Sequence, residues 1–371
     1  MKILLLISFL FSIAHARELS MTQKMDDFNE LVSRVRSGYG PLEYKEKLLG
    51  ISLNDLEQKY TTLIEQTKTN SEFYYLLVKF VAEFKDSHFG ARLPSTHKSY
   101  LGFRTDLINN KVLIETIDRK VLSESDFPFE KGDEIVSFNG VKPMEIIKKE
   151  LYPYMGQGSD LTALRTATSL LAFRHASIVP VKQGEVKLEI RKGNSDFLET
   201  VSLEWKLGGE PLDEFIDDTK MIPRYVLRPS PVEYDQIQLK MDPFIERDFR
   251  CSGATRTKIP EDATIIMKKP FTAYYHPTEK GNIGYLRIPH YSPRESDPKI
   301  DAYELRFSQY EYAIAKLEEN TVGLIIDQDH NCGGSVGYLH QIVSLFAEKP
   351  FAPTQFELLA NKSSYLSIKN W

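Results

Sequence analysis

Apolar side chains recur at intervals of three and four residues over the first quarter of the chain. The run NSEFYYLLVKFVAEF carries one such helical stripe behind a polar start, and either Asn70 or Ser71 would cap the helix. The stripe consists of Phe73, Leu76, Leu77, Phe80, Val81 and Phe84. Ser52 and Asp55 have the spacing of a weaker capping box ahead of another helix. We therefore predict a small helical segment with one apolar face over residues 17–98.

From about Tyr100 the pattern changes to the alternation of short strands. Two strand-like runs, YLGFRTD and KVLIETI, precede a Lys-Gly-Asp turn and a third strand over 134–138. Asn139 followed by glycine is typical of a two-residue hairpin turn, and the later run GEVKLEIRKG alternates again. These runs predict a β-rich domain over 99–206. Residues 207–280 are rich in proline and charge, have few clean periods, and are interpreted as an insertion or connection.

The C-terminal part has the clearest order of elements. A buried strand, IGYLRIP, is followed by a long amphipathic helix over 302–319, a second continuous apolar strand, VGLIID, and the helix YLHQIVSLF. This order predicts a parallel βαβ unit over 281–371. Sites in such sheets form beyond the carboxyl ends of the strands, where the loop 327–335 lies. Together the patterns predict an α+β multidomain protein.

Composition excludes some classes of function. Charged residues make up 27% of the 371 residues, with a net charge of −5, so no basic field favours nucleic acid. Only Cys251 and Cys332 are present, and a disulfide and two free thiols both remain open. Neither cysteine has the spacing of a metal ligand, and no metal or cofactor is expected.

The first sixteen residues predict a secretory signal. Lys2 provides a short positive region, Ile3 to Ile13 are largely apolar, and the motif Ala-His-Ala ends at Ala16. The apolar run is too short to span a bilayer, and no later stretch reaches that length. A buried N-terminal helix is the alternative. We expect an exported bacterial protein, periplasmic or extracellular, with no integral membrane segment after cleavage before Arg17.

The loop DQDHNCGGS raises the question of a calcium site. Asp327, Asp329 and Asn331 occupy positions 1, 3 and 5 of such a loop. The sixth position should be glycine but is Cys332, and the twelfth should be glutamate but is Tyr338. The spacing therefore excludes a calcium loop of this type.

Two other interpretations concern the glycines of this loop. The run around Ser335 spells G-x-S-x-G, the nucleophile elbow of α/β-hydrolases, but the strand ends at Ile326 and only His340 follows as a histidine. Adjacent Gly333 and Gly334 instead suit an oxyanion hole, because glycines let backbone N–H groups approach a substrate carbonyl. Ser335 would then cap the next helix. A plain glycine turn is the structural alternative.

These pieces together resemble the tail-specific, or C-terminal-processing, serine peptidases, and within them the branch of the chlamydial protease-like activity factor and tricorn-type cores. The resemblance rests on the D-x-H motif at 86–88, on YLGF and KGDEIVSFNGVKP, and on IGYLRIPHY with GLIIDQDHNCGGSVGYL. It covers about 70–206 and 281–350. It implies a PDZ-like domain and the N-terminal part of a crotonase-like protease core.

The resemblance also assigns roles to residues. His88 matches the general base, with Asp86 orienting its turn, and Gly333 and Gly334 match the oxyanion hole. The PDZ-like loop of Leu101, Gly102 and Phe103 matches a substrate-binding position. On local sequence alone, His88 could instead be a helix-end histidine stabilised by the helix dipole. The implied partner is a polypeptide substrate.

One departure from the family concerns the nucleophile. In the family the attacking serine lies several tens of residues after the glycine loop, and this chain ends at Trp371. Ser363, Ser364 and Ser367 do not lie in a suitable strand-to-helix context. We therefore expect the nucleophile to be missing from this chain, with a homodimer or a missing C-terminal fragment as open alternatives. The rival functions are a catalytically silent PDZ-like peptide-binding protein and an esterase using Ser335.

Overall fold

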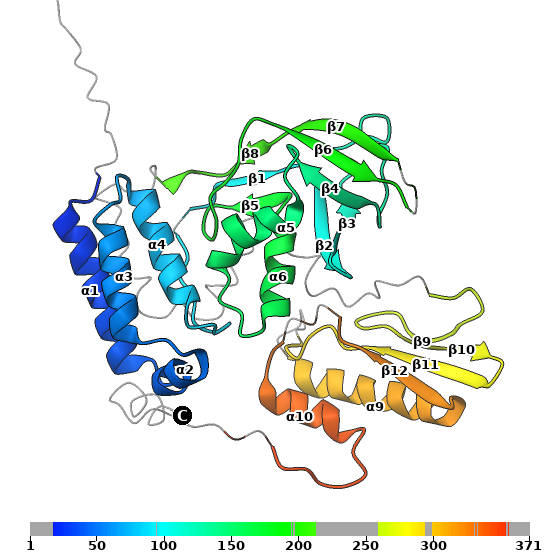
Figure 1. Cartoon of the computed structure of the whole chain (residues 1–371). Helices are drawn as coiled ribbons and strands as arrows, with labels where there is room; N and C mark the ends of the chain where they lie inside the picture. Colours follow the sequence, from blue (N-terminus) through cyan, green and yellow to red (C-terminus); the bar gives the residue numbers. More distant parts are fainter. Residues whose placement is uncertain are drawn as a thin grey trace, which may run out of the picture. The chain divides into compact units, whose positions relative to one another are not determined.

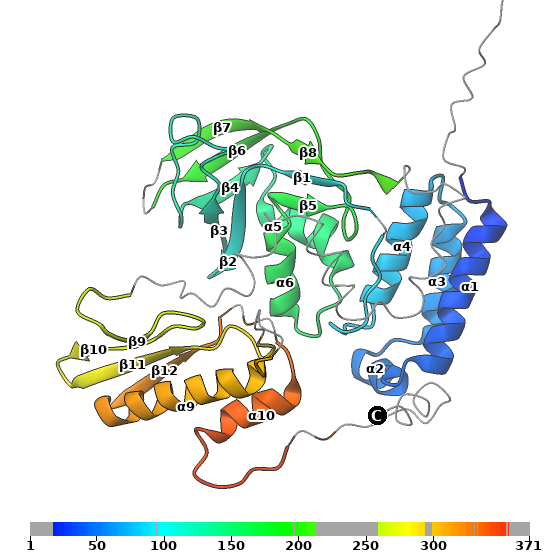
Figure 2. The same ribbon diagram turned by 180° about the vertical axis from the view of Figure 1, so that it is seen from behind.

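The computed structural model divides into two compact units, each described by itself below (Figures 1 and 2). The first comprises residues 1–223 and 358–371, and the second residues 224–357. The structure describes residues 18–93, 95–193, 195, 197–212, 259–293, 299–329, 331, 333–353 and 355. The predicted signal, both cysteines and the three serines near the C-terminus lie outside these residues.

Four helices open the first unit: α1 (Met21–Gly38), α2 (Leu42–Leu49), α3 (Leu53–Ile64) and α4 (Asn70–Ala82). Ser52 caps α3 as predicted, accepting from the Asp55 amide. The cap of α4 is Thr69, one residue earlier than predicted. Its hydroxyl accepts from the Glu72 amide while the Glu72 carboxylate accepts from the Thr69 amide, a full capping box that Asn70 could not form.

Aromatic rings hold these helices together. The predicted stripe is confirmed: Phe73, Phe80, Val81 and Phe84 are buried, and Leu76 and Leu77 pack against them half-buried. Phe80 is the centre of the cluster, with ring centroids 5.2 Å from Phe28 and 5.3 Å from Tyr60 in edge-to-face contacts. Edge-to-face aromatic pairs add to the burial of apolar area, so the cluster fixes α1, α3 and α4 relative to one another.

The β-rich domain follows in the same unit. Its five-stranded antiparallel sheet has the order β2-β3-β4-β6-β7. A second, three-stranded sheet has the order β5-β1-β8. The bounds are β1 Lys98–Tyr100, β2 Phe103–Ile108, β3 Lys111–Ile117, β4 Glu134–Phe138, β5 Phe173–His175, β6 Glu185–Arg191, β7 Leu198–Glu204 and β8 Lys206–Gly208.

The predicted Asn-Gly turn is present, but it does not join two long strands. Asn139 and Gly140 have φ of 50° and 77°, and Phe138 and Val141 exchange both backbone hydrogen bonds across them. The chain then enters the helix α5 (Pro143–Ile146), because Pro143 suits a first helical position. The π-helix η1 (Ile147–Leu151), the 3-10 helix η2 (Tyr152–Tyr154) and α6 (Asp160–Ser169) complete this domain.

The second unit contains the predicted βαβ arrangement. Its sheet has the order β12-β11-β10-β9, and β11 and β12 are parallel with α9 as the connection between them. The bounds are β9 Thr264–Met267, β10 Ala273–Thr278, β11 Gly281–Arg287, α9 Ala302–Asn320, β12 Gly323–Asp327 and α10 Val336–Ser344. Strands β9 and β10 precede residue 281, so this sheet takes in part of the segment expected to be a connection. The α+β class is confirmed.

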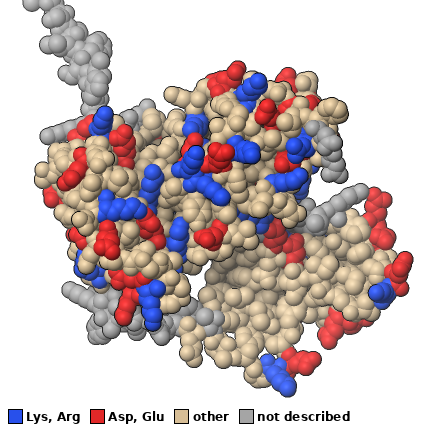
Figure 3. Space-filling view, viewed as in Figure 1, with Lys and Arg blue, Asp and Glu red and all other residues tan. Residues whose placement is uncertain are grey.

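Strand β12 differs from the buried strand that its apolar sequence predicts. It is an edge strand in the described sheet, and Leu324, Ile325 and Ile326 are 36%, 54% and 42% exposed. The pattern of apolar residues along a strand does not show how many strands pair with it. A strand that pairs on one side only leaves its other edge open. The face of this unit that carries α9 and α10 also shows few charged side chains (Figure 3). Among the described residues, no helix is long and apolar enough to cross a membrane.

Candidate functional site

His88 lies on a tight turn just after α4. The helix ends at Ala82, and Lys85 adopts a positive φ of 48° that takes the chain out of helical geometry. The turn closes with the Phe89 amide donating to the Asp86 carbonyl at 3.1 Å. His88 is exposed and lies beyond the last turn of α4, where the helix dipole has little effect. The dipole account of this histidine is therefore wrong.

Asp86 orients the turn, as expected from the motif. Its Oδ1 accepts from the His88 amide at 2.9 Å, and its Oδ2 accepts from the Tyr39 hydroxyl at 2.7 Å. Burial alone would raise the pKa of Asp86, but these two hydrogen bonds and the nearby Lys45 charge lower it below its ordinary value. Asp86 is therefore ionised at neutral pH, and it binds the backbone of His88.

Further contacts fix the same turn from other elements. Phe89 stacks on Tyr39 with ring centroids 4.6 Å apart, and Lys45 donates to the Lys85 carbonyl at 2.8 Å. Lys85 in turn donates from its Nζ to the Met155 carbonyl at 3.1 Å. The backbone under His88 is thus held from α2, from the end of α1 and from the segment after η2, while its imidazole faces outward. A fixed backbone with an exposed imidazole suits a proton shuttle.

A buried ion pair anchors the glycine loop at the carboxyl ends of β11 and β12. Arg287, only 1% exposed, donates from Nη1 to Asp327 Oδ1 at 2.7 Å. The same carboxylate accepts from the Tyr285 hydroxyl and, at 2.8 Å, from the Asp329 amide. Burial raises the pKa of Asp327, but these donors outweigh it, so that the pKa lies below its ordinary value.

The two glycine amides of this loop differ in their partners. Asn331 donates from Nδ2 to the Ile288 carbonyl at 2.8 Å, and its Oδ1 accepts from the Gly333 amide at 2.6 Å. The Gly333 carbonyl accepts from the Tyr291 amide at 2.7 Å. In the described part of the loop, the Gly334 N–H donates to no neighbouring group. Gly334 is therefore the better placed of the two to donate to a substrate oxygen, and the oxyanion role of both glycines stays a prediction.

Gly334 is also the position where no side chain fits. Its φ is 141°, and a Cβ would lie 2.3 Å from the carbonyl carbon of Tyr291. Ser335 follows with an ordinary φ of −69°, and its hydroxyl accepts from the Tyr338 amide at 3.3 Å, so it caps α10 as predicted. A nucleophile elbow needs a strained, exposed serine at a sharp turn. The geometry of Ser335 is that of a cap, which contradicts the esterase interpretation.

The PDZ-like loop lies inside its domain. Leu101 and Phe103 are 1% and 3% exposed, and the Leu101 amide donates to the Ala172 carbonyl at 2.9 Å. Gly102 has a φ of 91°, and its carbonyl accepts from the Asp118 amide at 2.8 Å. Substrate binding by this loop stays a prediction, and the side chains of Leu101 and Phe103 contribute to the core.

One serine–histidine pair was not predicted from the sequence. Ser177 Oγ lies 2.6 Å from His175 Nδ1, within the reach that nucleophilic catalysis requires. Burial, helped by the charges of Lys98, Arg92 and His97, lowers the pKa of His175 to about 4. Ser177 is 7% exposed. A buried serine beside such a weak base is better explained as a local structural contact.

The predicted site residues belong to different units. His88 and the PDZ-like loop lie in the first unit, and Gly333 and Gly334 lie in the second. Sequence reasoning missed Arg287, although an arginine within an apolar strand is a signal of a buried ion pair. It also missed Tyr39, whose contact with Asp86 spans 47 positions and leaves no local signal. Among the described residues, no cluster of three or more histidine, aspartate or glutamate side chains could hold a metal ion.

Comparison with known proteins places these observations in context. Residues 97–221 match the PDZ domain family. A Chlamydia pneumoniae protein is 24% identical over 396 residues, covering 96% of this chain and 62% of the relative. An uncharacterised Chlamydia muridarum protein is 23% identical and covers 100% and 66%. The chain thus spans less than two thirds of the length of these relatives.

Solved structures extend the comparison to the fold. Mature CPAF is 21% identical, covers 87% of this chain and 58% of its own, and has a TM-score of 0.66. A CPAF mutant covers the same share of this chain with a TM-score of 0.69, and mature CPAF has also been solved with lactacystin at 0.66. The resemblance predicted from the motifs is confirmed at the level of the fold. The chain has the fold of CPAF, the chlamydial protease-like activity factor, with a PDZ domain within it.

Proposed function

We propose that this chain belongs to a serine-type endopeptidase of the tail-specific type, which hydrolyses peptide bonds of polypeptide substrates by acyl transfer. The observation that carries the proposal is the His88 turn, whose backbone is fixed by Asp86, Lys45 and Phe89 while its imidazole is exposed. The likeness to the CPAF fold over 87% of this chain supports it.

Each residue has a stated part in the proposed reaction. His88 takes the proton from the attacking serine hydroxyl and later gives it to the leaving amine. The Gly334 N–H, with Gly333 once its bond to Asn331 opens, donates to the oxyanion of the tetrahedral intermediate. The attacking serine is proposed to lie outside the described residues, since Ser335 is a helix cap and Ser177 is buried.

The test uses the natural full-length protein and a panel of peptide substrates. Replacement of His88 by alanine should lower kcat/KM on the order of 10⁴-fold or more, because a missing base disables the catalytic serine. His276→Ala, a half-buried histidine on β10, is the matched control and should stay within about twofold. If the His88 variant cleaves normally and His175→Ala does not, the base is His175 and the proposal is wrong.

A fluorophosphonate label identifies the serine independently. It should modify one serine other than Ser335 and Ser177, and lactacystin, which CPAF binds in its solved complex, is a second probe to try against that label. Labelling of Ser335 would restore the esterase interpretation. No label in a preparation that still binds peptides would favour the peptide-binding alternative.

We also propose that the protein is exported, to the periplasm or beyond the cell. The support is the charge of Lys2, the apolar run Ile3 to Ile13 and the small residues that end at Ala16. Peptide mapping of the protein from its own cell should find an N-terminus at Arg17. An intact Met1 in the exported fraction would contradict cleavage.

A further inference from the structure

Tyr291 and the glycine loop of the second unit are joined by two backbone hydrogen bonds. The Tyr291 amide donates to the Gly333 carbonyl at 2.7 Å, and the Ser335 amide donates to the Tyr291 carbonyl at 3.0 Å. The two bonds form a parallel bridge in which Gly334 pairs with Tyr291. The segment that follows β11 therefore holds the loop on both sides of Gly334.

This bridge sets the direction of the Gly334 N–H. The Gly333 carbonyl and the Gly334 N–H belong to one trans peptide group, and in such a planar group they point in opposite directions. Because the carbonyl points at the Tyr291 amide, the N–H points away from Tyr291, and in the described part of the loop it donates to no neighbouring group. A hydrogen bond accepted by the carbonyl also polarises the peptide, so that its N–H becomes a stronger donor.

The side chain of Tyr291 fixes the backbone that forms the bridge. Tyr291 is 6% exposed, and its ring belongs to the apolar cluster of the second unit together with Leu286, Ile288 and Tyr310. Its hydroxyl donates to Gln328 Oε1 at 2.9 Å, near the start of the same loop. Burial raises the pKa of this hydroxyl, so it stays protonated and remains a donor at neutral pH. Tyr291 thus contacts the loop near its start through the hydroxyl and at its end through the bridge.

We propose that Tyr291 is a positioning residue of the oxyanion hole. Its bridge and its hydroxyl hold the Gly333–Gly334 peptide so that the Gly334 N–H faces the substrate oxygen. The inference rests on the proposed function, since it assigns a task within the same reaction. Tyr291 does not touch the substrate in this account and acts on the reaction only through Gly334. In the sequence it is the last residue of the run IGYLRIPHY, where no local signal gives it a role.

Three variants of the natural full-length protein test this role. Tyr291→Phe keeps the ring and loses the bond to Gln328. It should lower kcat about three- to tenfold, the effect of one net hydrogen bond, and leave KM within about twofold. Gln328→Met removes the same bond from the other side and should lower kcat by the same factor. The double variant should be no slower than either single variant, because both changes break one bond.

A peptide aldehyde measures the oxyanion contact separately from substrate binding. The oxygen of the attacking serine bonds to the aldehyde carbon, the carbonyl π electrons move to the aldehyde oxygen, and the serine proton passes to the base. The adduct thus carries an oxyanion, whereas the corresponding peptide alcohol forms no adduct. In Tyr291→Phe the inhibition constant of the aldehyde should rise by the factor by which kcat/KM falls, and that of the alcohol should stay within about twofold.

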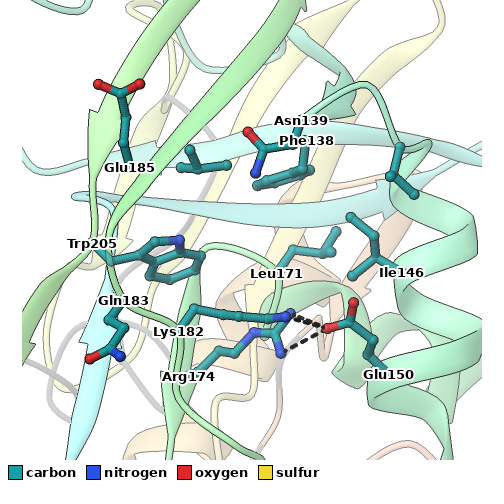
Figure 4. A pocket seen from close by; sticks show the side chains of 12 residues that line it. Phe138, Asn139, Ile146, Glu150, Leu171, Arg174, Lys182, Gln183, Glu185 and Trp205 are labelled. Atoms are coloured by element: carbon teal, nitrogen blue, oxygen red, sulfur yellow. Dashed lines mark hydrogen bonds and ion pairs between the residues drawn. The ribbon is translucent and has the colours of Figure 1, made fainter.

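Tyr338→Phe is the matched control. Tyr338 is 2% exposed in the same apolar cluster, and its hydroxyl has no hydrogen-bond partner among the described residues. Loss of this hydroxyl should leave kcat within about twofold. Far-UV circular dichroism checks that each variant is folded. Trp205, which lines a small cavity of the PDZ domain in the first unit, is the internal reference (Figure 4). Its fluorescence, in a Trp371→Phe background, should be the same in every variant.

Each contrary result overturns the inference for a different reason. A Tyr291→Phe variant with the kcat of the wild type would show that the hydroxyl does not position the loop. Equal weakening of the aldehyde and the alcohol would show that Tyr291 shapes the peptide-binding surface and not the oxyanion hole. Additive losses in the double variant would show that Tyr291 and Gln328 act separately. A wild type that cleaves no peptide overturns the proposed function and this inference with it, whereas an active wild type beside an unaffected variant overturns the inference alone.

Discussion

Replacement of Asp327 by asparagine tests the ion pair beneath the glycine loop. The asparagine keeps the shape of the side chain but removes its charge, and it leaves Arg287 buried without a counter-ion. Breaking a buried pair in this way costs about 3–5 kcal/mol. The amide oxygen can still accept one bond, from Arg287 or from Tyr285, and the Asp327 side chain is 15% exposed. We therefore expect a loss near the lower end, about 3 kcal/mol.

Urea unfolding measures this loss. Trp205 fluorescence follows the first unit, and far-UV circular dichroism follows both, so a transition seen by circular dichroism but not by fluorescence belongs to the second unit. For an m-value of about 1–3 kcal/mol/M, the transition of the second unit should move down by roughly 1–3 M. Glu319→Gln breaks the exposed pair with Lys316 and should cost ~0.5 kcal/mol or less. A shift in the Asp327 variant no larger than in this control would refute the reasoning.

The same pair makes stability depend on pH. The pKa of Asp327 is lowered from its ordinary value of 3.8, so its contribution is complete above that value and is lost as the pH falls through the folded pKa. The wild type should therefore lose its advantage over Asp327→Asn only in acid. The unfolding midpoints of the wild type and of Asp327→Asn should approach each other as the pH falls from 7 to 2. A difference between the midpoints that stays constant over this range would show that the carboxylate is not the group involved.

Two further substitutions test the loop and the turn. Gly334→Ala should destabilise the second unit by about 3 kcal/mol or more, because its Cβ would collide with the Tyr291 backbone. Gly333→Ala meets open space and should cost only the ~1–2 kcal/mol of a left-handed backbone. Equal unfolding midpoints of the two variants would refute the steric argument. Tyr39→Phe should cost roughly 1.5–3 kcal/mol in thermal unfolding and raise the pKa of Asp86, as measured by NMR titration. Tyr44→Phe, at an exposed tyrosine of α2, is the matched control.

Local patterns predicted local structure well. The stripe from Phe73 to Phe84 repeats with the helical period, so its burial follows from the sequence alone. The cap of α4 is Thr69 and not Asn70 or Ser71, because of these three only Thr69 has a glutamate three residues later with which to form the reciprocal bond. The parallel βαβ order was equally visible, since an apolar strand, an amphipathic helix and a second apolar strand follow one another in the sequence.

Contacts between distant residues were not predictable in the same way. Nothing near Tyr39 indicates that its hydroxyl binds Asp86, and nothing near Asn331 indicates that its side-chain amide donates to the Ile288 carbonyl. The cavity beside Trp205 likewise depends on residues from several elements. Only tertiary packing brings such groups together, so the candidate base was found from its motif while the groups that hold it were not.

Strand β12 has a consequence for handling the protein. Among the described strands, β12 has one neighbour, β11, and its branched side chains are exposed. Such a strand is a template on which foreign chains can add, so we expect concentrated preparations of these 371 residues to form β-rich aggregates that start at this edge. Ile325 is the most exposed of these residues within the strand. A lysine there would place a charge in the path of any added strand, and should keep the protein dispersed without changing either unit's interior.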